Sequence, residues 1–398
     1  MSDLFQAELH QLRAQSLHRK LREIGTAQAA EVLIVGERLV NFSSNDYLGL
    51  ANDPLLRDAA IEAVGEFGVG SGASRLVSGT LSPHIRLETA LAKWKGTQAA
   101  LSFSSGYAAA VGTLQAIVSK QDVVLLDKLS HASLIDGAKL SGAILRVFSH
   151  NHLGKLESHL EWARREHPDS RVVIVSESVF SMDGDRAPLR ELVGLKKRYD
   201  AMLLLDEAHA VGVIGPNGRG LAAEEGLTRH IDIQMGTLSK ALGVSGGYIC
   251  GSRSLIDWLI NRARSFIFST APPPALAVAA TAAVEFLGSE AGEERRLKLW
   301  DRVQILRDAL RGGVQNKTDA MQTGSAIHPL IVGEEAAAMD LSRLLQAEGF
   351  LAPAIRYPTV AKGAARLRIT VTAAHEEQQI RRLVEALNRL RPDMTLLA

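Results

Sequence analysis

The sequence has almost no cysteine and lacks any long apolar run. One cysteine, Cys250, occurs in 398 residues, so no disulfide can form within the chain, and Cys250 lacks the neighbouring ligands of a zinc site. No segment approaches the roughly 18 consecutive apolar residues of a membrane-spanning helix. The first 25 residues carry acids and helical spacing in place of the apolar core of a signal peptide. We therefore expect a cytoplasmic protein with Cys250 in its core and no metal.

An excess of charge of either sign is also missing. Lysine and arginine number 45 against 44 aspartate and glutamate, which leaves a net charge of +1. Such a balance provides neither a basic field for nucleic acid nor an acidic tail. We expect small-molecule partners, with no nucleic acid and no membrane. Because 46% of the residues are hydrophobic, the chain can bury a large core and is long enough for two domains.

Short apolar runs alternate with amphipathic stretches through the middle of the chain. Helical periodicity is clear in residues 152–167 and 188–199. Near-continuous apolar strands that alternate with helices predict an α/β fold with a mostly parallel sheet covered on both faces. Ligands should then bind at the carboxyl ends of the strands. The predicted strands are residues 99–103, 123–127, 144–148, 172–178, 201–209, 231–236 and 246–251.

The order of elements changes towards the C-terminus. A triple proline within residues 271–288 ends an extended segment and opens an alanine-rich helix. The later strands and helices predict a smaller α+β domain; they are the strand-like residues 325–333, 350–360 and 365–373 and the helical residues 336–349 and 375–390. We expect an N-terminal segment, a large domain and a small C-terminal domain, which span residues 1–45, 46–288 and 289–398.

Two short motifs suggest other classes of enzyme. Residues 206–209 read Asp-Glu-Ala-His, as in a helicase, but ATP hydrolysis requires an upstream G-x-x-x-x-G-K-[ST] loop, and the sequence has none. The glycine-rich residues 68–79 contain no lysine. Residues 243–247, GVSGG, match the G-x-S-x-G elbow of α/β-hydrolases, in which a strand precedes the serine. Here the predicted strand follows Ser245, so neither class is favoured.

A different chemistry fits several polar residues near predicted strand ends. Ser105, Gly106 and Tyr107 open a predicted helix, whose free amides can bind a phosphate. Asp206 follows an apolar strand, and a carboxylate can keep a pyridine nitrogen protonated. Lys240 lies in GTLSKALG, and a lysine amine can form a Schiff base with an aldehyde. Together these groups meet the requirements of pyridoxal 5'-phosphate.

Seven segments of the sequence form a set that extends this interpretation. They are NFSSNDYLGL, GVGSGASRLVSGT, LSHASLIDGAKLSGA, ESVFSMDGDRAPL, DEAHAVGVIGPNGRG, GTLSKALGVSGG and ARLRITVTAAH. The set resembles the α-oxoamine synthases, which are fold-type-I pyridoxal-phosphate enzymes, and it spans residues 40 to 380. The resemblance implies a large cofactor-binding domain, a smaller C-terminal domain, and the joining of an amino acid to an acyl thioester with loss of carbon dioxide.

The resemblance also implies roles around the cofactor ring. Lys240 would hold the cofactor and then remove the α-proton of the amino acid, a task that suits a desolvated amine. Asp206 would pair with the ring nitrogen, and His209 with the phenolic oxygen of the ring. His131 would stack on the ring and assist acyl transfer. The alternative for an isolated histidine or lysine is a structural or surface role.

Further residues would contact the edge and the phosphate of the cofactor. By resemblance, Ser181 would contact the polar edge of the ring, and Thr237 would bind the phosphate. Thr270 in FSTAPPP is similar to a family threonine that reaches the phosphate of the neighbouring subunit. The resemblance therefore implies a homodimer with shared active sites.

The substrate-binding residues lie closer to the two ends of the chain. Arg368 would take the amino-acid carboxylate, for which a guanidinium is suited. The acyl substrate would be faced by Arg356, Thr359 and Arg22. For Arg356 and Thr359, the alternative interpretation is a purely structural role. Asn45 would lie near the site or cap a turn.

The segment AIRYPTVAKGAARLRITVTAAHEEQQI favours one branch of the family. It is most similar to members that condense L-alanine with a pimeloyl thioester, carried on coenzyme A or on an acyl carrier protein. Tyr357 and Ala361 depart from the usual AIRPPTVP of that branch. The alternatives are relatives that use glycine with acetyl or succinyl thioesters, or serine with long acyl chains.

Overall fold

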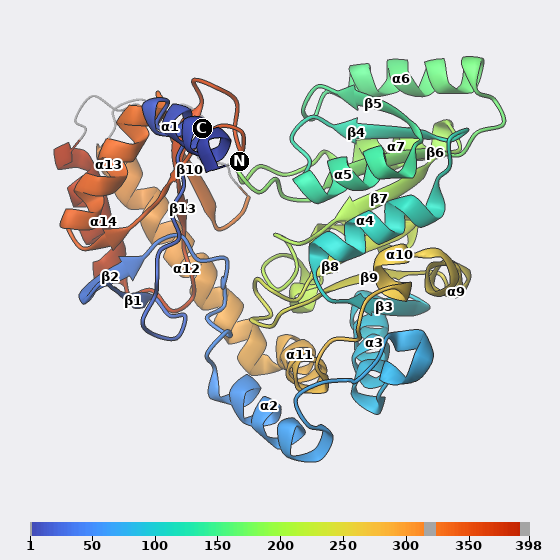
Figure 1. The fold of residues 1–398 in the computed structure, drawn as a ribbon, viewed down its shortest axis with the longest axis horizontal. Helices are drawn as coiled ribbons and strands as arrows, with labels where there is room; N and C mark the ends of the chain where they lie inside the picture. The colour runs from blue at the N-terminus through green and yellow to red at the C-terminus, as the bar shows by residue number, and fades with distance from the viewer. Residues whose placement is uncertain (1, 314–323, 391–398) are drawn as a thin grey trace. The chain divides into compact units, whose positions relative to one another are not determined.

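The computed structural model describes residues 2–313 and 324–390 of the chain (Figure 1). The chain divides into two compact units. Unit 1 comprises Met1–Gly49, Met182–Gly184 and Leu297–Ala398, and unit 2 comprises Leu50–Ser181 and Asp185–Arg296. The N-terminal and C-terminal segments thus belong to the same unit, and the central segment forms the other.

Unit 2 is built on a seven-stranded sheet with the strand order β3-β9-β8-β7-β6-β4-β5. Neighbouring strands from β8 to β5 run parallel, while β9 is antiparallel to both β3 and β8. This arrangement confirms the prediction of a mostly parallel sheet. The strands are β3 (Ala99–Phe103), β4 (Val123–Asp127), β5 (Ile144–Phe148), β6 (Val172–Glu177), β7 (Met202–Asp206), β8 (Ile233–Thr237) and β9 (Gly247–Gly251).

Helices follow most of these strands and cover the sheet. On one face, Leu114 of α4, Leu134 of α5 and Leu259 of α9 join a single apolar core with alternate strand residues. The strand residues between them are buried as well, as expected for a sheet covered on both faces. Figure 1 shows α4 and α5 side by side. The helices of this unit are α2 (Pro54–Phe67), α3 (Ser82–Lys95), α4 (Gly106–Ile117), α5 (Ala132–Ser141), α6 (Leu153–Glu166), α7 (Leu189–Arg198), α8 (Leu221–Glu224), α9 (Arg253–Arg262), α10 (Arg264–Ile267) and α11 (Pro274–Leu287).

The carboxyl ends of the parallel strands carry polar residues. β4 ends at Asp127, β6 at Glu177, β7 at Asp206 and β8 at Thr237. All four side chains are buried. Because parallel strands end at the same edge of a sheet, these polar groups collect along one edge, where ligands of open α/β sheets bind.

Unit 1 contains two small sheets with amphipathic helices. The sheets have the orders β1-β2-β11 and β10-β13-β12. In α14, Ile380, Leu383, Val384 and Leu387 are buried at helical spacing, which explains why this segment forms a helix. The elements are α1 (Ser2–Ala14), most of α12 (Glu290–Gly313), α13 (Glu335–Ala347), α14 (Glu377–Leu390), β1 (Glu31–Ile34), β2 (Glu37–Asn41), β10 (Ile327–Gly333), β11 (Phe350–Leu351), β12 (Ala354–Ile355) and β13 (Ala365–Thr370).

The prediction of a single strand-like segment over residues 350–360 is wrong. Two short strands, β11 and β12, occupy its first part, and they belong to different sheets. Pro353 lies between them. Because proline has no backbone N–H to donate to a ladder, the pairing of β11 with β2 cannot continue through it.

Among the helices of the described ranges, no single helix is both long and apolar enough to cross a membrane. The segments Pro274–Leu287 and Glu290–Leu310 meet the criteria only as a pair, by length and composition, and they are bent by 78°.

Candidate active site

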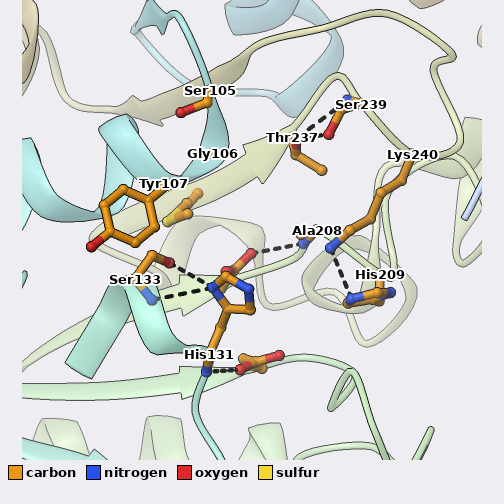
Figure 2. A pocket seen from close by; sticks show the side chains of 13 residues that line it. Ser105, Gly106, Tyr107, His131, Ser133, Ala208, His209, Thr237, Ser239 and Lys240 are labelled. Carbon is orange, nitrogen blue, oxygen red and sulfur yellow. Dashed lines mark hydrogen bonds between the residues drawn. The ribbon is translucent and has the colours of Figure 1, made fainter. Parts of the chain in front are cut away.

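A cavity of about 230 Å³ lies in unit 2 and contains the residues from the carboxyl ends of several strands. Figure 2 shows the side chains that line it. They come from segments far apart in the sequence, which only the sheet brings together. The lining residues are Ser105, Gly106, Tyr107, His131, Ser133, Glu177, Asp206, Ala208, His209, Met235, Thr237, Ser239 and Lys240.

Lys240 lies in the turn that follows β8. Its Nζ is 2.8 Å from Nε2 of His209, and Figure 2 shows both side chains at one side of the cavity. The turn closes through a hydrogen bond from the Gly243 amide to the Lys240 carbonyl. Gly243 has a φ of +72°, and a Cβ there would lie 2.6 Å from the Ala51 nitrogen. A glycine is therefore needed at this position to hold Lys240 in place.

Asp206 is buried at the end of β7. Its Oδ1 accepts a hydrogen bond of 2.8 Å from the Ala208 amide, which orients the carboxyl group. Burial raises the pKa of Asp206, while the Lys240 charge and the Ala208 hydrogen bond oppose that shift. The carboxyl group is thus placed to interact with a cationic group in the cavity.

His131 precedes α5 and caps its first turn. Its Nδ1 accepts a hydrogen bond of 3.2 Å from the Ser133 amide and lies 2.8 Å from the Ser133 hydroxyl, as Figure 2 shows. A ring nitrogen that accepts from an amide carries no proton, so the proton of a neutral ring is on Nε2. Burial lowers the pKa of His131, which also favours the neutral ring.

The first turn of α4 supplies amide groups to the cavity. Ser105 caps the helix, and its hydroxyl accepts from the Ala108 amide at 3.0 Å. A Cβ at Gly247 of β9 would lie 2.5 Å from the Ser105 carbonyl oxygen, so glycine permits the close packing of this turn on the sheet. Thr237 lies beside it, with its hydroxyl 2.8 Å from that of Ser239. Helix amides and two hydroxyls together form an environment suited to a phosphate.

Two residues predicted for the cofactor site are outside the cavity lining. Among the described residues, Ser181 is buried in the loop after β6 but does not line the cavity, nor does Thr270. Thr270 is exposed and forms an isolated β-bridge with Ser74. The other predicted cofactor residues all line the cavity.

The predicted substrate residues belong to unit 1. Arg368 of β13 is buried, and its guanidinium donates to Asn45 Oδ1 at 3.0 Å and to the Tyr47 hydroxyl at 3.3 Å. Two interpretations of Asn45 were open from the sequence, a position near the site or a cap of a turn. In the structure its side chain contacts Arg368. The buried guanidinium is held in one orientation by these two contacts.

Arg356 and Thr359 lie close to the basic segment after α1. Arg356 donates to the carbonyl groups of Ser16 and His18, and Arg19 donates to the Thr359 hydroxyl at 3.2 Å. Burial lowers the pKa of Arg356, and the charges of Arg19 and Arg22 add to that shift. Arg22 is exposed. The structure thus brings Arg22, Arg356 and Thr359 into one basic cluster, which also includes Arg19.

Sequence reasoning missed several residues of the cavity, above all Glu177. It ends β6, and it is the Cα partner of Asp206 across the β6–β7 pairing. The rule that polar residues at strand ends line the site could have found it, because β6 and β7 were both predicted. Within the described ranges, no group of three or more His, Cys, Asp or Glu residues is placed to hold a metal ion.

Comparisons with known proteins show the family of the chain. The family model of aminotransferase class I and II matches residues 37–387. The 8-amino-7-oxononanoate synthase of Geobacter sulfurreducens is 46% identical over 391 residues, which cover 98% of both chains. Serine palmitoyltransferase from S. paucimobilis, in a structure with bound PLP and myriocin, matches 98% of this chain and 97% of its own with a TM-score of 0.91 and 30% identity. The 8-amino-7-oxononanoate synthase of Francisella tularensis matches 89% of this chain and 98% of its own, with a TM-score of 0.75 and 27% identity.

Proposed function

Because the chain belongs to the aminotransferase class I and II family, and within it to the 8-amino-7-oxononanoate synthases, we propose the following reaction for it. It condenses L-alanine with a pimeloyl thioester and releases carbon dioxide, the free thiol and 8-amino-7-oxononanoate, a step of biotin biosynthesis. The pyridoxal 5'-phosphate enzyme is thus a C-acyltransferase. The use of glycine with an acetyl or succinyl thioester, or of serine with a long acyl chain, is less favoured, because the 8-amino-7-oxononanoate synthase of Geobacter sulfurreducens is 46% identical to this chain and the serine palmitoyltransferase is 30% identical.

One observation in this structure carries the proposal. A single cavity combines an amine, two carboxyl groups, two imidazoles and the amides of a helix N-terminus. Lys240 and Asp206 approach from different strand ends, and Thr237 and Ser239 adjoin the first turn of α4. These residues fit the cofactor, because an aldehyde, a ring nitrogen and a phosphate each find a group of matching chemistry.

When bound, pyridoxal 5'-phosphate supplies an aldehyde for an amine and a ring that accepts electrons. Lys240 would hold the aldehyde carbon, and Asp206 would keep a proton on the ring nitrogen. The amides of Gly106 and Tyr107 and the hydroxyl of Thr237 would bind the phosphate. His209 and Ser181 would contact the polar edge of the ring, and His131 would pack on its face.

The protein groups also have tasks in proton transfer. Lys240, after its displacement by the substrate amine, would remove the α-proton of L-alanine. Its hydrogen bond to His209 Nε2 gives the amine a defined direction, which a general base requires. His131, with its proton on Nε2, would donate a hydrogen bond to the thioester oxygen as negative charge develops on it.

Substrate binding is assigned to residues of unit 1. Arg368 would bind the carboxylate of L-alanine through its guanidinium. Arg22, Arg356 and Thr359 of the basic cluster would face the pimeloyl group, whose far end is polar. The thioester would be carried on coenzyme A or on an acyl carrier protein.

We also propose a homodimer with shared active sites in the cytoplasm. Thr270 is exposed, and it would bind the cofactor phosphate in the active site of the neighbouring subunit. In that assembly each cavity would be completed by the partner. Sedimentation at assay concentration tests this, since a fully active monomer would contradict it.

Product identification tests the reaction itself. The holoenzyme is offered L-alanine, glycine and serine together with pimeloyl, acetyl, succinyl and palmitoyl thioesters, and the products are identified by mass spectrometry. We expect L-alanine with pimeloyl thioester to exceed glycine with acetyl thioester by at least about 10³ in kcat/KM, or about 4 kcal/mol. Preference for glycine and acetyl thioester would refute the assignment to biotin biosynthesis while leaving the cofactor chemistry in place.

A further inference from the structure

Two buried carboxyl groups lie next to each other in the cavity. Glu177 and Asp206 are the last residues of the neighbouring parallel strands β6 and β7, and their Cα atoms are partners in the register. Both line the cavity, and their exposed fractions are only 2% and 5%. Paired parallel residues project to the same face of a sheet, so the two acids share one environment.

Each carboxyl group receives one amide hydrogen bond. The His131 amide donates to Glu177 Oε1 at 2.5 Å, and the Ala208 amide donates to Asp206 Oδ1 at 2.8 Å. The first of these bonds is drawn as the dashed line from the His131 backbone in Figure 2. Glu177 therefore holds the backbone of His131, as well as adjoining Asp206.

The positive charge near this pair is limited. Lys240 is the cation that acts on both acids, and His131 is neutral because its Nδ1 accepts from the Ser133 amide. Two further acids lie nearby, but each has its own cation: Asp127 is 3.0 Å from His150, and Glu207 is 2.5 Å from Lys95. Two ionised carboxylates would thus share the charge of Lys240 in a buried site, where like charges side by side are costly.

Protonation of one acid of the pair would relieve this repulsion. Burial raises the pKa of Glu177 well above its ordinary value and Asp206 adds to that shift, although the Lys240 charge and the His131 amide oppose it. The pKa of Asp206 is also raised by burial, but the Lys240 charge and the Ala208 amide oppose the shift. Two interacting acids titrate as a pair, and here the environment separates their roles.

We propose that Glu177 is a positioning residue that stands in the folded protein as a neutral carboxylic acid beside the ionised Asp206. Asp206 then carries the negative charge that the ring nitrogen meets, and Glu177 fixes the backbone of His131. The role of Asp206 towards the ring rests on the proposed function. The protonation of Glu177 does not, because it follows from the residues of the cavity alone.

Carbon-13 NMR tests the proposal directly. Holoenzyme labelled at the glutamate carboxyl carbon is titrated from pH 5 to 9, and one resonance is expected to stay at the protonated position at pH 7. Glu177→Gln should remove that resonance. Glu207→Gln is the matched control, since Glu207 is also fully buried but paired with Lys95, and it should leave the resonance in place. The absence of a protonated glutamate at pH 7, or its survival in Glu177→Gln, overturns the proposal.

The pH dependence of stability provides a second test with a defined sign. A glutamate whose folded pKa is raised above the unfolded value, about 4.3, stabilises the protein below that pH and loses this contribution as the pH rises towards the folded pKa. Gln cannot ionise, so the variant Glu177→Gln does not lose this contribution. The Tm of the variant minus the Tm of the parent protein should therefore rise from pH 5 to 8. A relative Tm that stays constant or falls over this range would mean that Glu177 is already ionised in the folded protein, and would overturn the proposal.

Cofactor binding separates this proposal from the proposed function. Glu177→Gln retains an acceptor for the His131 amide and should bind pyridoxal 5'-phosphate within about twofold of the parent, with an unchanged pH profile of the cofactor absorbance. Glu177→Leu lacks the acceptor and should bind at least tenfold more weakly, because a buried amide would be left without its partner. A shift of the absorbance profile in Glu177→Gln would overturn the proposal. If the NMR result stands but no ketone product forms, only the proposed function fails.

Discussion

Two lysines of unit 2 have contrasting surroundings. Lys95, at the end of α3, is buried, with its Nζ 2.5 Å from Glu207 Oε2 and in contact with the Arg219 carbonyl. Lys240 is half-buried, lines the cavity and meets the imidazole of His209 at 2.8 Å. An amine held by a carboxylate and a carbonyl has a structural role. An amine that faces a cavity beside an imidazole is placed to react.

The two acids that accompany these lysines are adjacent in the sequence. Asp206 lines the cavity, whereas Glu207 joins Lys95 and also accepts from the Ala222 amide at 3.0 Å. Successive residues at a strand end point in opposite directions. One dipeptide therefore supplies both a site residue and an anchor for the loops around it.

The largest expected effect comes from Lys240→Ala. Product formation should fall by at least about 10²-fold, because a positioned general base is lost. Borohydride reduction of the parent holoenzyme should leave the pyridoxyl label on the peptide that contains Lys240, with the peptide of Lys95 as the internal control. Recovery of the label on Lys95 would show that Lys95, and not Lys240, holds the cofactor.

Lys95→Met tests the structural member of the comparison. Removal of the cation leaves Glu207 charged and buried, which should lower the free energy of unfolding by about 3–5 kcal/mol. Urea unfolding monitored by circular dichroism measures this. In the double variant Lys95→Met, Glu207→Gln much of the loss should be recovered, since no buried charge remains. A single variant as stable as the parent would show that the pair contributes little.

Asp206→Asn removes the charge on the cavity side. We expect the fold to be retained and the rate to fall by about 10²-fold, or about 2.7 kcal/mol, because the protonated ring nitrogen would lose its anionic partner. Absorbance of the bound cofactor after addition of L-alanine is the measurement. Glu207→Gln is the control, and it should affect the unfolding midpoint more than the absorbance. A normal spectral response in Asp206→Asn would mean that a group other than Asp206 keeps the ring nitrogen protonated.

His150 provides a smaller test, as a cation between two carboxylates. Its ring nitrogens lie 3.0 Å from Asp127 and 2.8 Å from Asp185. Burial disfavours its charge, but the two aspartates prevail and raise the pKa of His150 to about 10. Since the folded pKa exceeds the unfolded value of about 6.5, this stabilisation is complete below that pH and is lost as the pH rises through about 10.

His150→Gln should therefore lower stability by about 1.5–3 kcal/mol at pH 6, the value of hydrogen bonds to charged groups. The difference from the parent should shrink between pH 8 and 10.5 in thermal unfolding. His152→Gln is a nearby control, because that side chain caps α6 through the Lys155 amide and does not bridge two acids in the described structure. A difference that is constant with pH would contradict the ionic role of His150.

Much of the fold could be predicted, because it depends on local patterns. The apolar runs 99–103, 123–127 and 144–148 coincide with β3, β4 and β5. Cys250 is buried in β9, as expected. Where the pattern was interrupted by Pro353, the predicted segment divided into two strands of different sheets. Apolar periodicity indicates an element, but it does not specify the partner of each strand.

The candidate site was predictable to the extent that its residues lie in motifs at strand ends. Lys240, Asp206, His209 and His131 were named from the sequence, and all line one cavity. Glu177 was missed because its importance depends on its register with Asp206. Ser181 follows the same strand but is outside the cavity lining of the described structure.

By itself, the sequence determined the apolar strands and helices and the residue types available for chemistry, since both follow from the order of side chains along the chain. The tertiary structure decided which of those residues meet. Strand pairing placed Glu177 beside Asp206, and the direction of successive side chains separated Asp206 from Glu207, which joined Lys95. Burial and charge balance, which set the protonation of these groups, arise only when distant segments pack together.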